Sequence, residues 1–236
     1  MFLSASTKMS DAPCAASLSA APLGIFGGTF DPVHLGHLRL AEEAADCLGL
    51  QAIRWIPAGR PAHRRPPQAD PAQRLAMVQL AVAGNARFEV DPAESEALTP
   101  SYTVPTLERL RLTNLCANRP LVLLLGADAF AGLSTWHRWE NLFDLAHIAV
   151  AHRPGFPIDV QALAAPLAAH FRQRYSETPA SLGASPAGSI LSFAMTPLAI
   201  SATQIRELIA GGRSARYLLP DSLIAYIQKN LLYSPQ

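Results

Sequence analysis

Short apolar runs alternate along the chain with segments in which apolar positions recur three or four residues apart. The first run, 23–26, stops at Gly27 and Gly28, which is typical of a buried strand that enters a tight turn. Over 35–48 the apolar positions follow helical spacing, and Gly49 marks the expected end of that helix. The repeated alternation of strand and helix predicts an α/β fold, a parallel sheet with helices on both faces.

Later segments continue this alternation. Further strands are expected at 52–56, 87–90, 121–125, 147–151 and 190–195, and further helices at 70–84, 102–112, 201–210 and 222–232. Another helix is expected over 160–175, where Pro166 would kink or interrupt it. The segment 176–189 is rich in Ser, Ala, Gly and Pro and is predicted to be a mobile linker or an insertion. Right-handed crossovers place the loops that follow the strands on one edge, where such sheets bind ligands.

Composition limits the classes of partner. Half of the 236 residues are hydrophobic, 16% are charged, and the formal net charge is +1. This balance argues against a protein that grips a long nucleic acid, although a small anion needs only local donors. No apolar run approaches the ~20 residues that span a bilayer, so we expect no membrane contact. Cys14, Cys47 and Cys116 show neither metal-ligand spacing nor a disulfide framework, which favours the reducing cytoplasm.

The first 22 residues are small and polar, without the apolar segment of a secretory signal. We interpret residues 1–22 as a flexible N-terminal arm or as the product of a start site assigned too early. Residues 23–236 are then expected to form a single domain. We keep both a monomer and a homo-oligomer as alternatives.

The loop between the first strand and the first helix holds most of the candidate chemistry. Gly27 and Gly28 let the backbone turn sharply and approach a ligand. The helix start that follows offers free N–H groups and a positive dipole end, which suit a phosphate. His34 and His37 are three residues apart on one face, where charged imidazoles can offset charge that develops as a phosphoanhydride breaks. A zinc site is disfavoured because no third ligand has a matching spacing.

The stretch 27–37 resembles the H-x-G-H signature of the nucleotidyltransferase superfamily. The resemblance implies a Rossmann-like doubly wound sheet and adenylyl or cytidylyl transfer. It also implies that His34 and His37 are catalytic, with His37 close to the α-phosphate of a nucleoside triphosphate. Contacts to ATP are implied for four loop residues: Gly27, Gly28, Thr29 and Phe30.

A second motif of the same superfamily, I-S-S-T-x-I-R, is matched near the C-terminus. Taken alone, Ser201 followed three residues later by Gln204 is a capping box that starts a helix. The cap does not explain Arg206, which lies one turn into the helix and can donate to a triphosphate. By resemblance, Ser201, Thr203 and Arg206 bind ATP phosphates and Arg206 is catalytic. Ala202 stands where the family pattern has a second serine.

Further motifs resemble bacterial nicotinate-nucleotide adenylyltransferases and extend the similarity over almost all of the chain after the arm. They lie at 101–107, 126–128, 136–139, 153–155 and 216–220. The resemblance implies transfer of AMP from ATP to nicotinate mononucleotide, with one Mg²⁺ held mostly by phosphates and water. Gly126 and Asp128 are implied to contact the nucleotides, and Asp128 alternatively caps the helix that follows it.

The acceptor has an aromatic ring and a carboxylate, and the sequence offers partners for both. Trp136 and Tyr102 can supply flat surfaces for the ring, and the turn at Tyr102 and Thr103 can supply donors for the carboxylate. Trp139 follows Trp136 by three residues on an expected helix, and we predict that Trp139 is the buried one of the two. Arg153 is assigned to the substrate by resemblance.

The basic loop at His63 and Arg64 has two interpretations. It corresponds to a Pro-His-Lys pattern of the family and would close on the phosphates, although Arg64 replaces the lysine and the two cations differ in shape. It is equally well explained as a solvated basic loop. Two other functions also stay open: an adenylyltransferase for nicotinamide mononucleotide or phosphopantetheine, and a non-catalytic nucleotide-binding protein of the same fold.

Overall fold

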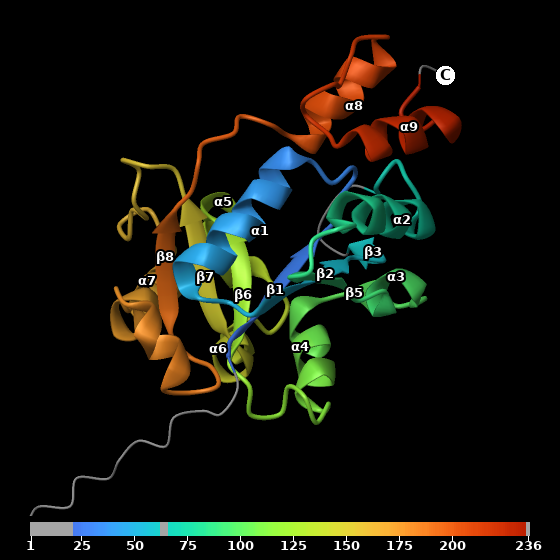
Figure 1. Ribbon diagram of the computed structural model, residues 1–236. Coiled ribbons are helices and arrows are strands. Elements are labelled where there is room, and N and C mark those ends of the chain that lie inside the picture. The colour runs from blue at the N-terminus through green and yellow to red at the C-terminus, as the bar shows by residue number, and fades with distance from the viewer. Residues whose placement is uncertain (1–20, 62–65, 235–236) are drawn as a thin grey trace, which may run out of the picture.

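The computed structural model describes residues 21–61 and 66–234 of the chain. Its centre is a parallel sheet in the order β4-β2-β1-β6-β7-β8 (Figure 1). The strands are β1 (Leu23–Gly28), β2 (Ala52–Pro57), β4 (Phe88–Val90), β6 (Leu121–Gly126), β7 (His147–His152) and β8 (Ile190–Ala194). The order runs outward in opposite directions from β1 and β6. The doubly wound, Rossmann-like sheet is therefore confirmed, and the place where its order reverses lies between these two strands.

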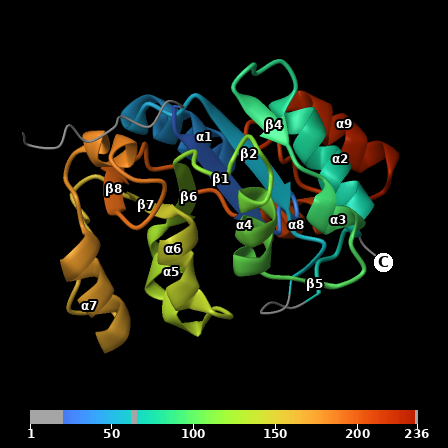
Figure 2. The same cartoon turned by 90° about the horizontal axis from the view of Figure 1, so that it is seen from below.

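Helices cover both faces of the sheet (Figure 2). One face packs against α1 (Leu35–Leu48), α2 (Pro71–Val82), α8 (Ala202–Ala210) and α9 (Asp221–Lys229). The other packs against α4 (Thr103–Arg111), α5 (Ala127–Ala131), α6 (Leu142–Leu145) and α7 (Ala165–Arg174). Two layers of helix around one sheet give two separate apolar cores, one on each side.

Strand β6 shows why the central strands are apolar without interruption. Val122 and Leu124 pack into the core beside α1, whereas Leu121, Leu123 and Leu125 pack into the core beside α4. Successive side chains of a strand point to opposite faces, so a strand covered on both faces must be apolar at every position. All five leucine and valine side chains are buried.

The ends of the first two long helices follow local sequence signals. Helix α1 ends at Gly49, whose φ of 62° is left-handed and suits glycine. Helix α2 begins after Asp70, whose carboxylate accepts a hydrogen bond from the Gln73 backbone N–H at 2.8 Å. The Gln73 side chain accepts in return from the Asp70 N–H at 3.0 Å. Both helix ends therefore match the sequence-based prediction.

The segment 176–189 is packed against the sheet, so the prediction of a mobile linker is wrong. It contains the short 3₁₀ helix η3 (Pro179–Gly183), and the side chain of Leu182 is fully buried. The buried His147 ring contacts the Ser185 carbonyl oxygen at 2.9 Å and accepts a hydrogen bond from the Ser189 N–H at 3.1 Å. Two backbone groups of the segment thus satisfy both ring nitrogens of a buried histidine.

Two other expectations about this half of the chain are corrected. Helix α7 begins at Ala165, so Pro166 lies in its first turn, where a proline causes no kink. Trp136 and Trp139 do not share a helix: Trp136 follows the 3₁₀ helix η1 (Leu133–Thr135), and Trp139 begins η2 (Trp139–Asn141). Arg138 between them has a left-handed φ of 55°, which interrupts helical geometry. Both tryptophans are partly buried, so the prediction that Trp139 is the buried one of the two is wrong.

A small layer beside the main sheet was not expected. Strands β3 (Arg60–Pro61) and β5 (Pro100–Ser101) pair in parallel, and α3 (Ala93–Glu96) packs against the turn that follows β2. A Cβ at Gly59 would lie 2.0 Å from the Glu94 carbonyl oxygen, so only glycine allows this approach. Elements of two to four residues are too short to produce a recognisable period in the sequence.

The proposed arm falls almost entirely outside the described residues, which begin at Ala21. The carbonyl oxygen of Ala21 accepts a hydrogen bond from Arg119 Nε at 2.7 Å, and that of Pro22 accepts one from the Gln51 N–H at 3.0 Å. These two residues thus belong to the folded part and not to the arm. In the described ranges, none of the helices has both the length and the apolar character needed to cross a membrane.

Candidate active site

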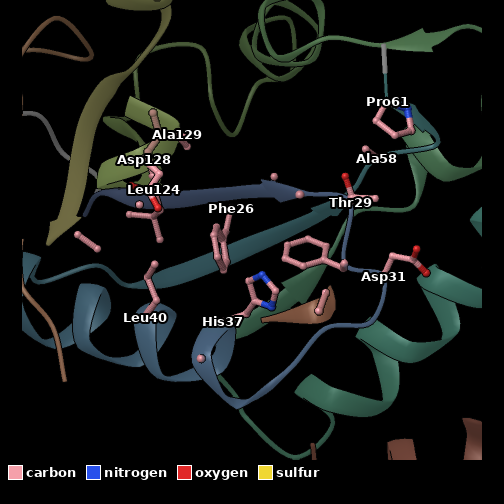
Figure 3. Close-up of a pocket in the computed structure, with 18 of the residues that line it drawn as sticks. Phe26, Thr29, Asp31, His37, Leu40, Ala58, Pro61, Leu124, Asp128 and Ala129 are labelled. Atoms are coloured by element: carbon pink, nitrogen blue, oxygen red, sulfur yellow. The ribbon is translucent and has the colours of Figure 1, made fainter. Parts of the chain in front are cut away.

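A cavity of about 1320 Å³ opens at the carboxyl edge of the sheet, where β1 and β6 diverge (Figure 3). Every predicted site residue that the structure describes lines it: Gly27, Gly28, Thr29, Phe30, His34, His37, Tyr102, Thr103, Gly126, Asp128, Trp136, Arg153, Ser201, Thr203 and Arg206. His63 and Arg64 lie outside the described residues. Segments from the whole length of the chain therefore meet at the edge that the topology indicated.

The two histidines lie at the start of α1 with their rings stacked, the centroids 3.7 Å apart and the planes at 29°. His34 is the residue before the helix, and its N–H donates to Nδ1 of His37 at 3.3 Å. Nδ1 of His37 is therefore an acceptor, and Nε2 is the ring nitrogen that can act as a donor. The pair forms one unit on a single face of the first turn, as its spacing predicted.

Burial lowers the pKa of His34 to about 4, because the surrounding protein disfavours the charged ring. The side chain is only 6% exposed. At neutral pH His34 is consequently uncharged, which corrects the expectation that both imidazoles supply positive charge. A neutral ring acts on a phosphate through a hydrogen bond and not through charge.

Glycines in this loop leave room for specific rings. A Cβ at Gly28 would lie 2.8 Å from the Phe30 ring, and one at Gly36 would lie 3.0 Å from the His34 ring. Phe30 is buried and packs edge-on against Phe26, so it forms the floor of the loop more than a surface for a ligand. The loop can therefore hold its backbone close to the cavity only with small residues at these two positions.

Helix α8 brings a cation and hydroxyl groups to the same cavity. The Ser201 hydroxyl accepts a hydrogen bond from the Gln204 N–H at 3.1 Å, which is one of the two bonds of the predicted capping box. One turn later, Arg206 donates to the Thr203 hydroxyl at 3.2 Å and to the Asp31 carbonyl oxygen at 2.7 Å. The first backbone N–H groups of α8 also have no acceptor within the helix, because no earlier turn supplies a carbonyl oxygen. These donors suit the oxygens of a polyphosphate.

The loop after β1 is held by a buried arginine that the sequence analysis missed. Arg74 on α2 is fully buried and donates to the carbonyl oxygens of Thr29 at 2.8 Å, Gly59 at 2.6 Å and Ala69 at 3.2 Å, and also to that of Ala58. Asp31 was likewise missed, although it lies inside the first motif. Local patterns cannot pair residues so distant in the sequence.

The opposite end of the cavity is formed by the start of α4 and the loop at Trp136. Tyr102 immediately precedes α4, and its ring lies 4.8 Å from that of His137. Arg138 forms a two-pronged ion pair with Glu108 on α4, with distances of 2.6 and 3.2 Å. This pair fixes the loop against the helix, so Trp136 and Tyr102 lie at the same end of the cavity.

Asp128 is exposed in the first turn of α5, and the residue that caps this helix is Gly126. The alternative that Asp128 caps this helix is therefore wrong. The Asp128 carboxylate lines the cavity instead. Within 21–61 and 66–234, no three His, Cys, Asp or Glu side chains come together as metal ligands.

The low pKa of His34 predicts a pH dependence of stability. In the unfolded chain the pKa of His34 is near 6.5, whereas in the folded protein it is about 4. The contribution of neutral His34 to the free energy of unfolding is therefore fully present above pH 6.5. It is lost as the pH falls toward 4, because the unfolded chain takes up the proton first. Between about pH 7 and 4.5, urea unfolding should show that the unmodified protein loses about 2 kcal/mol more than His34→Gln. Equal losses in the two proteins would contradict this assignment.

Comparison with known proteins identifies relatives over nearly the whole chain. A family model described as cytidylyltransferase-like matches residues 25–208. A protein of Dechloromonas aromatica (strain RCB), named "Probable nicotinate-nucleotide adenylyltransferase", is 63% identical over 212 residues, covering 90% of this chain and 97% of its own. A protein of the same name from Pseudomonas aeruginosa (strain UCBPP-PA14) is 49% identical and covers 89% and 96%.

Solved structures agree on the fold. Plasmodium falciparum nicotinic acid mononucleotide adenylyltransferase complexed with NaAD superimposes with a TM-score of 0.63 at 16% sequence identity, covering 91% of this chain and 98% of that one. The family model spans well over half of the chain, and the sequence relatives match it almost end to end. The chain therefore belongs to the nicotinate-nucleotide adenylyltransferase family of cytidylyltransferase-like nucleotidyltransferases.

Proposed function

We propose that this protein transfers the AMP moiety of ATP to nicotinate mononucleotide, giving deamido-NAD and pyrophosphate. The observation that carries the proposal is the meeting of two kinds of surface in one cavity. Its phosphate end has the histidine pair and the start of α8, and its other end has the aromatic residues Tyr102 and Trp136. Membership of the family supports the same substrates. The free thiols of Cys47 and Cys116 fit a location in the reducing cytoplasm.

The chemistry is an in-line displacement at phosphorus. A phosphate oxygen of nicotinate mononucleotide forms a bond to the α-phosphorus of ATP. The bond from that phosphorus to the bridging oxygen breaks, and its electron pair leaves with pyrophosphate. The attacking oxygen is already an anion, so no side chain has to remove a proton from it. Catalysis then depends on alignment and on donors that stabilise the transition state.

His34, His37 and Arg206 are the proposed sources of that stabilisation. Arg206 supplies a permanent positive charge, and the two imidazoles supply hydrogen bonds at the start of α1, where the helix dipole also favours an anion. Gly27, Gly28 and Thr29 bring backbone groups to the triphosphate, with Phe30 beneath them. Mg²⁺ bound to the phosphates would contribute further positive charge at the leaving pyrophosphate.

The acceptor is proposed to lie between Trp136 and the start of α4. Stacking on Trp136 and Tyr102 would hold the pyridine ring, and the N–H groups at Thr103 would meet its carboxylate. Arg153, exposed at the end of β7, also lines the cavity and is available to an acceptor phosphate. The remaining residues are proposed to contact ATP: Ser201 and Thr203 on α8, and Gly126 and Asp128 after β6.

Acceptor choice separates this function from its closest alternatives. We expect pyrophosphate release from ATP to be about tenfold or more faster with nicotinate mononucleotide than with nicotinamide mononucleotide, because a site built for a carboxylate leaves donors unpaired against an amide. Phosphopantetheine should give less still. The measurement is a coupled pyrophosphate assay with the three acceptors at equal concentration. Faster turnover with another acceptor would reassign the substrate, and no turnover with any would favour a non-catalytic binding protein.

Removal of the His37 ring tests the catalytic end. We expect His37→Ala to lower kcat by more than about tenfold, since one donor to the transition state is lost. The variant should unfold at nearly the temperature of the unmodified protein, because His37 is only partly buried. Steady-state kinetics with thermal unfolding as the control measures both. A folded His37→Ala protein with near-normal kcat would remove His37 from the mechanism.

A further inference from the structure

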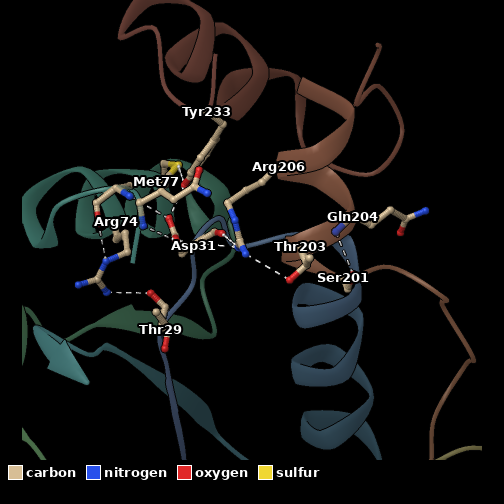
Figure 4. Close-up of polar contacts among 11 residues, drawn as sticks. Thr29, Asp31, Arg74, Met77, Ser201, Thr203, Gln204, Arg206 and Tyr233 are labelled. Atoms are coloured by element: carbon tan, nitrogen blue, oxygen red, sulfur yellow. Dashed lines mark hydrogen bonds and ion pairs between the residues drawn. The ribbon is translucent and has the colours of Figure 1, made fainter. Parts of the chain in front are cut away.

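Near the C-terminus, Tyr233 contacts the first motif. Tyr233, which follows α9, donates from its hydroxyl to Oδ1 of Asp31 at 2.7 Å (Figure 4). The two residues are 202 positions apart, and both are buried, with 7% and 6% of their surface exposed. This contact joins the C-terminal segment to the loop that follows β1, and the reaction described above assigns no role to Tyr233.

The Asp31 carboxylate is held from several directions. Besides the phenol, Oδ1 accepts from the Ala69 N–H at 3.2 Å, and Oδ2 accepts from the Gln68 N–H at 2.8 Å. Arg74 and Arg206 are the cations nearest to this network. A buried carboxylate is tolerated only when hydrogen bonds and opposite charge replace its water. The phenol is the one side-chain hydroxyl among the donors to Asp31 within the described residues.

Residue 31 is also what anchors Arg206. Its backbone carbonyl accepts from Nη1 of Arg206 at 2.7 Å, and its Oδ2 lies 4.0 Å from the same nitrogen. The other terminal nitrogen donates to the Thr203 hydroxyl. The guanidinium that lines the cavity is therefore fixed on one side by its own helix and on the other by the loop that Tyr233 holds. Figure 4 shows Asp31 between Tyr233 and Arg206.

We infer that Tyr233 is a positioning residue for nucleotidyl transfer, acting on Arg206 through Asp31. The inference rests on the proposed function, in which Arg206 contacts the triphosphate. Without the phenolic hydroxyl, the Asp31 carboxylate loses a donor and the loop can shift. A shift of about 1 Å at a catalytic group is enough to lower a rate substantially.

The hydroxyl is suited to a permanent structural contact. Burial and the neighbouring Asp31 carboxylate both raise the pKa of Tyr233, so the phenol is protonated and can donate at neutral pH. The ring of Tyr233 belongs to the apolar core with Leu223 and Ile227 of α9. Tyr233→Phe keeps this packing and removes only the donor.

A double-mutant cycle separates positioning through Arg206 from a general loss of structure. The proteins are the unmodified chain, Tyr233→Phe, Arg206→Ala and the double variant, with kcat and KM measured for ATP and for nicotinate mononucleotide. We expect Tyr233→Phe to lower kcat/KM for ATP by about five- to tenfold and to leave the KM for nicotinate mononucleotide within about twofold. In the Arg206→Ala background the same change should cost less than about twofold.

Tyr226→Phe on α9 is the matched control, because it removes the hydroxyl of a partly buried tyrosine outside the Asp31 network. It should leave kcat/KM unchanged. Thermal unfolding establishes the temperature range in which each variant is folded, and the cycle is measured at a temperature at which all four proteins are folded. The inference would be overturned if Tyr233→Phe lowered kcat/KM for ATP equally in the presence and absence of Arg206. An equal loss of kcat/KM in Tyr226→Phe would also overturn it. An unmodified protein that releases no pyrophosphate would instead refute the proposed function.

Discussion

Two buried charges of opposite sign, Asp31 and Arg74, hold the phosphate end of the cavity together. The guanidinium binds carbonyl oxygens at the ends of β1 and β2, and the carboxylate binds N–H groups just before α2. Burial lowers the pKa of Arg74 and the nearby Asp31 opposes that shift, so each charge makes the other tolerable. The loss of either would leave an uncompensated charge inside the protein. Together the two charges join the first motif to the end of β2 and to the start of α2.

This arrangement explains how a chain with a net charge of only +1 can have a site suited to polyanions. The cations at the phosphate end are few. One of them, Arg74, donates its hydrogen bonds to backbone carbonyl oxygens. In the proposed function, the rest of the attraction comes from Arg206, hydrogen bonds from the two imidazoles and the starts of α1 and α8. The acceptor end differs, because aromatic rings and an ion pair between Arg138 and Glu108 define it.

The sequence predicts the sheet and most of the cavity because those features depend on local signals. Continuous apolar runs reveal strands such as β6, capping residues reveal the ends of α1 and α2, and motif residues follow strand ends. What escapes prediction depends on contacts between distant segments. The fixing of Asp31 by Tyr233, the backbone role of 176–189 and the break at Arg138 have no local pattern. The short elements around Gly59 leave too few residues to show a period.

The central claim is that one buried network couples the first motif, the start of α2 and the C-terminal segment. Hydrogen–deuterium exchange of unmodified protein and Asp31→Ala tests it most directly, because exchange reports local opening at each segment separately. The account predicts faster exchange in the variant at three places together: the loop 27–37, residues 68–70 and residues 230–234. Faster exchange confined to Gln68 and Ala69, whose acceptor is removed, would contradict the claim.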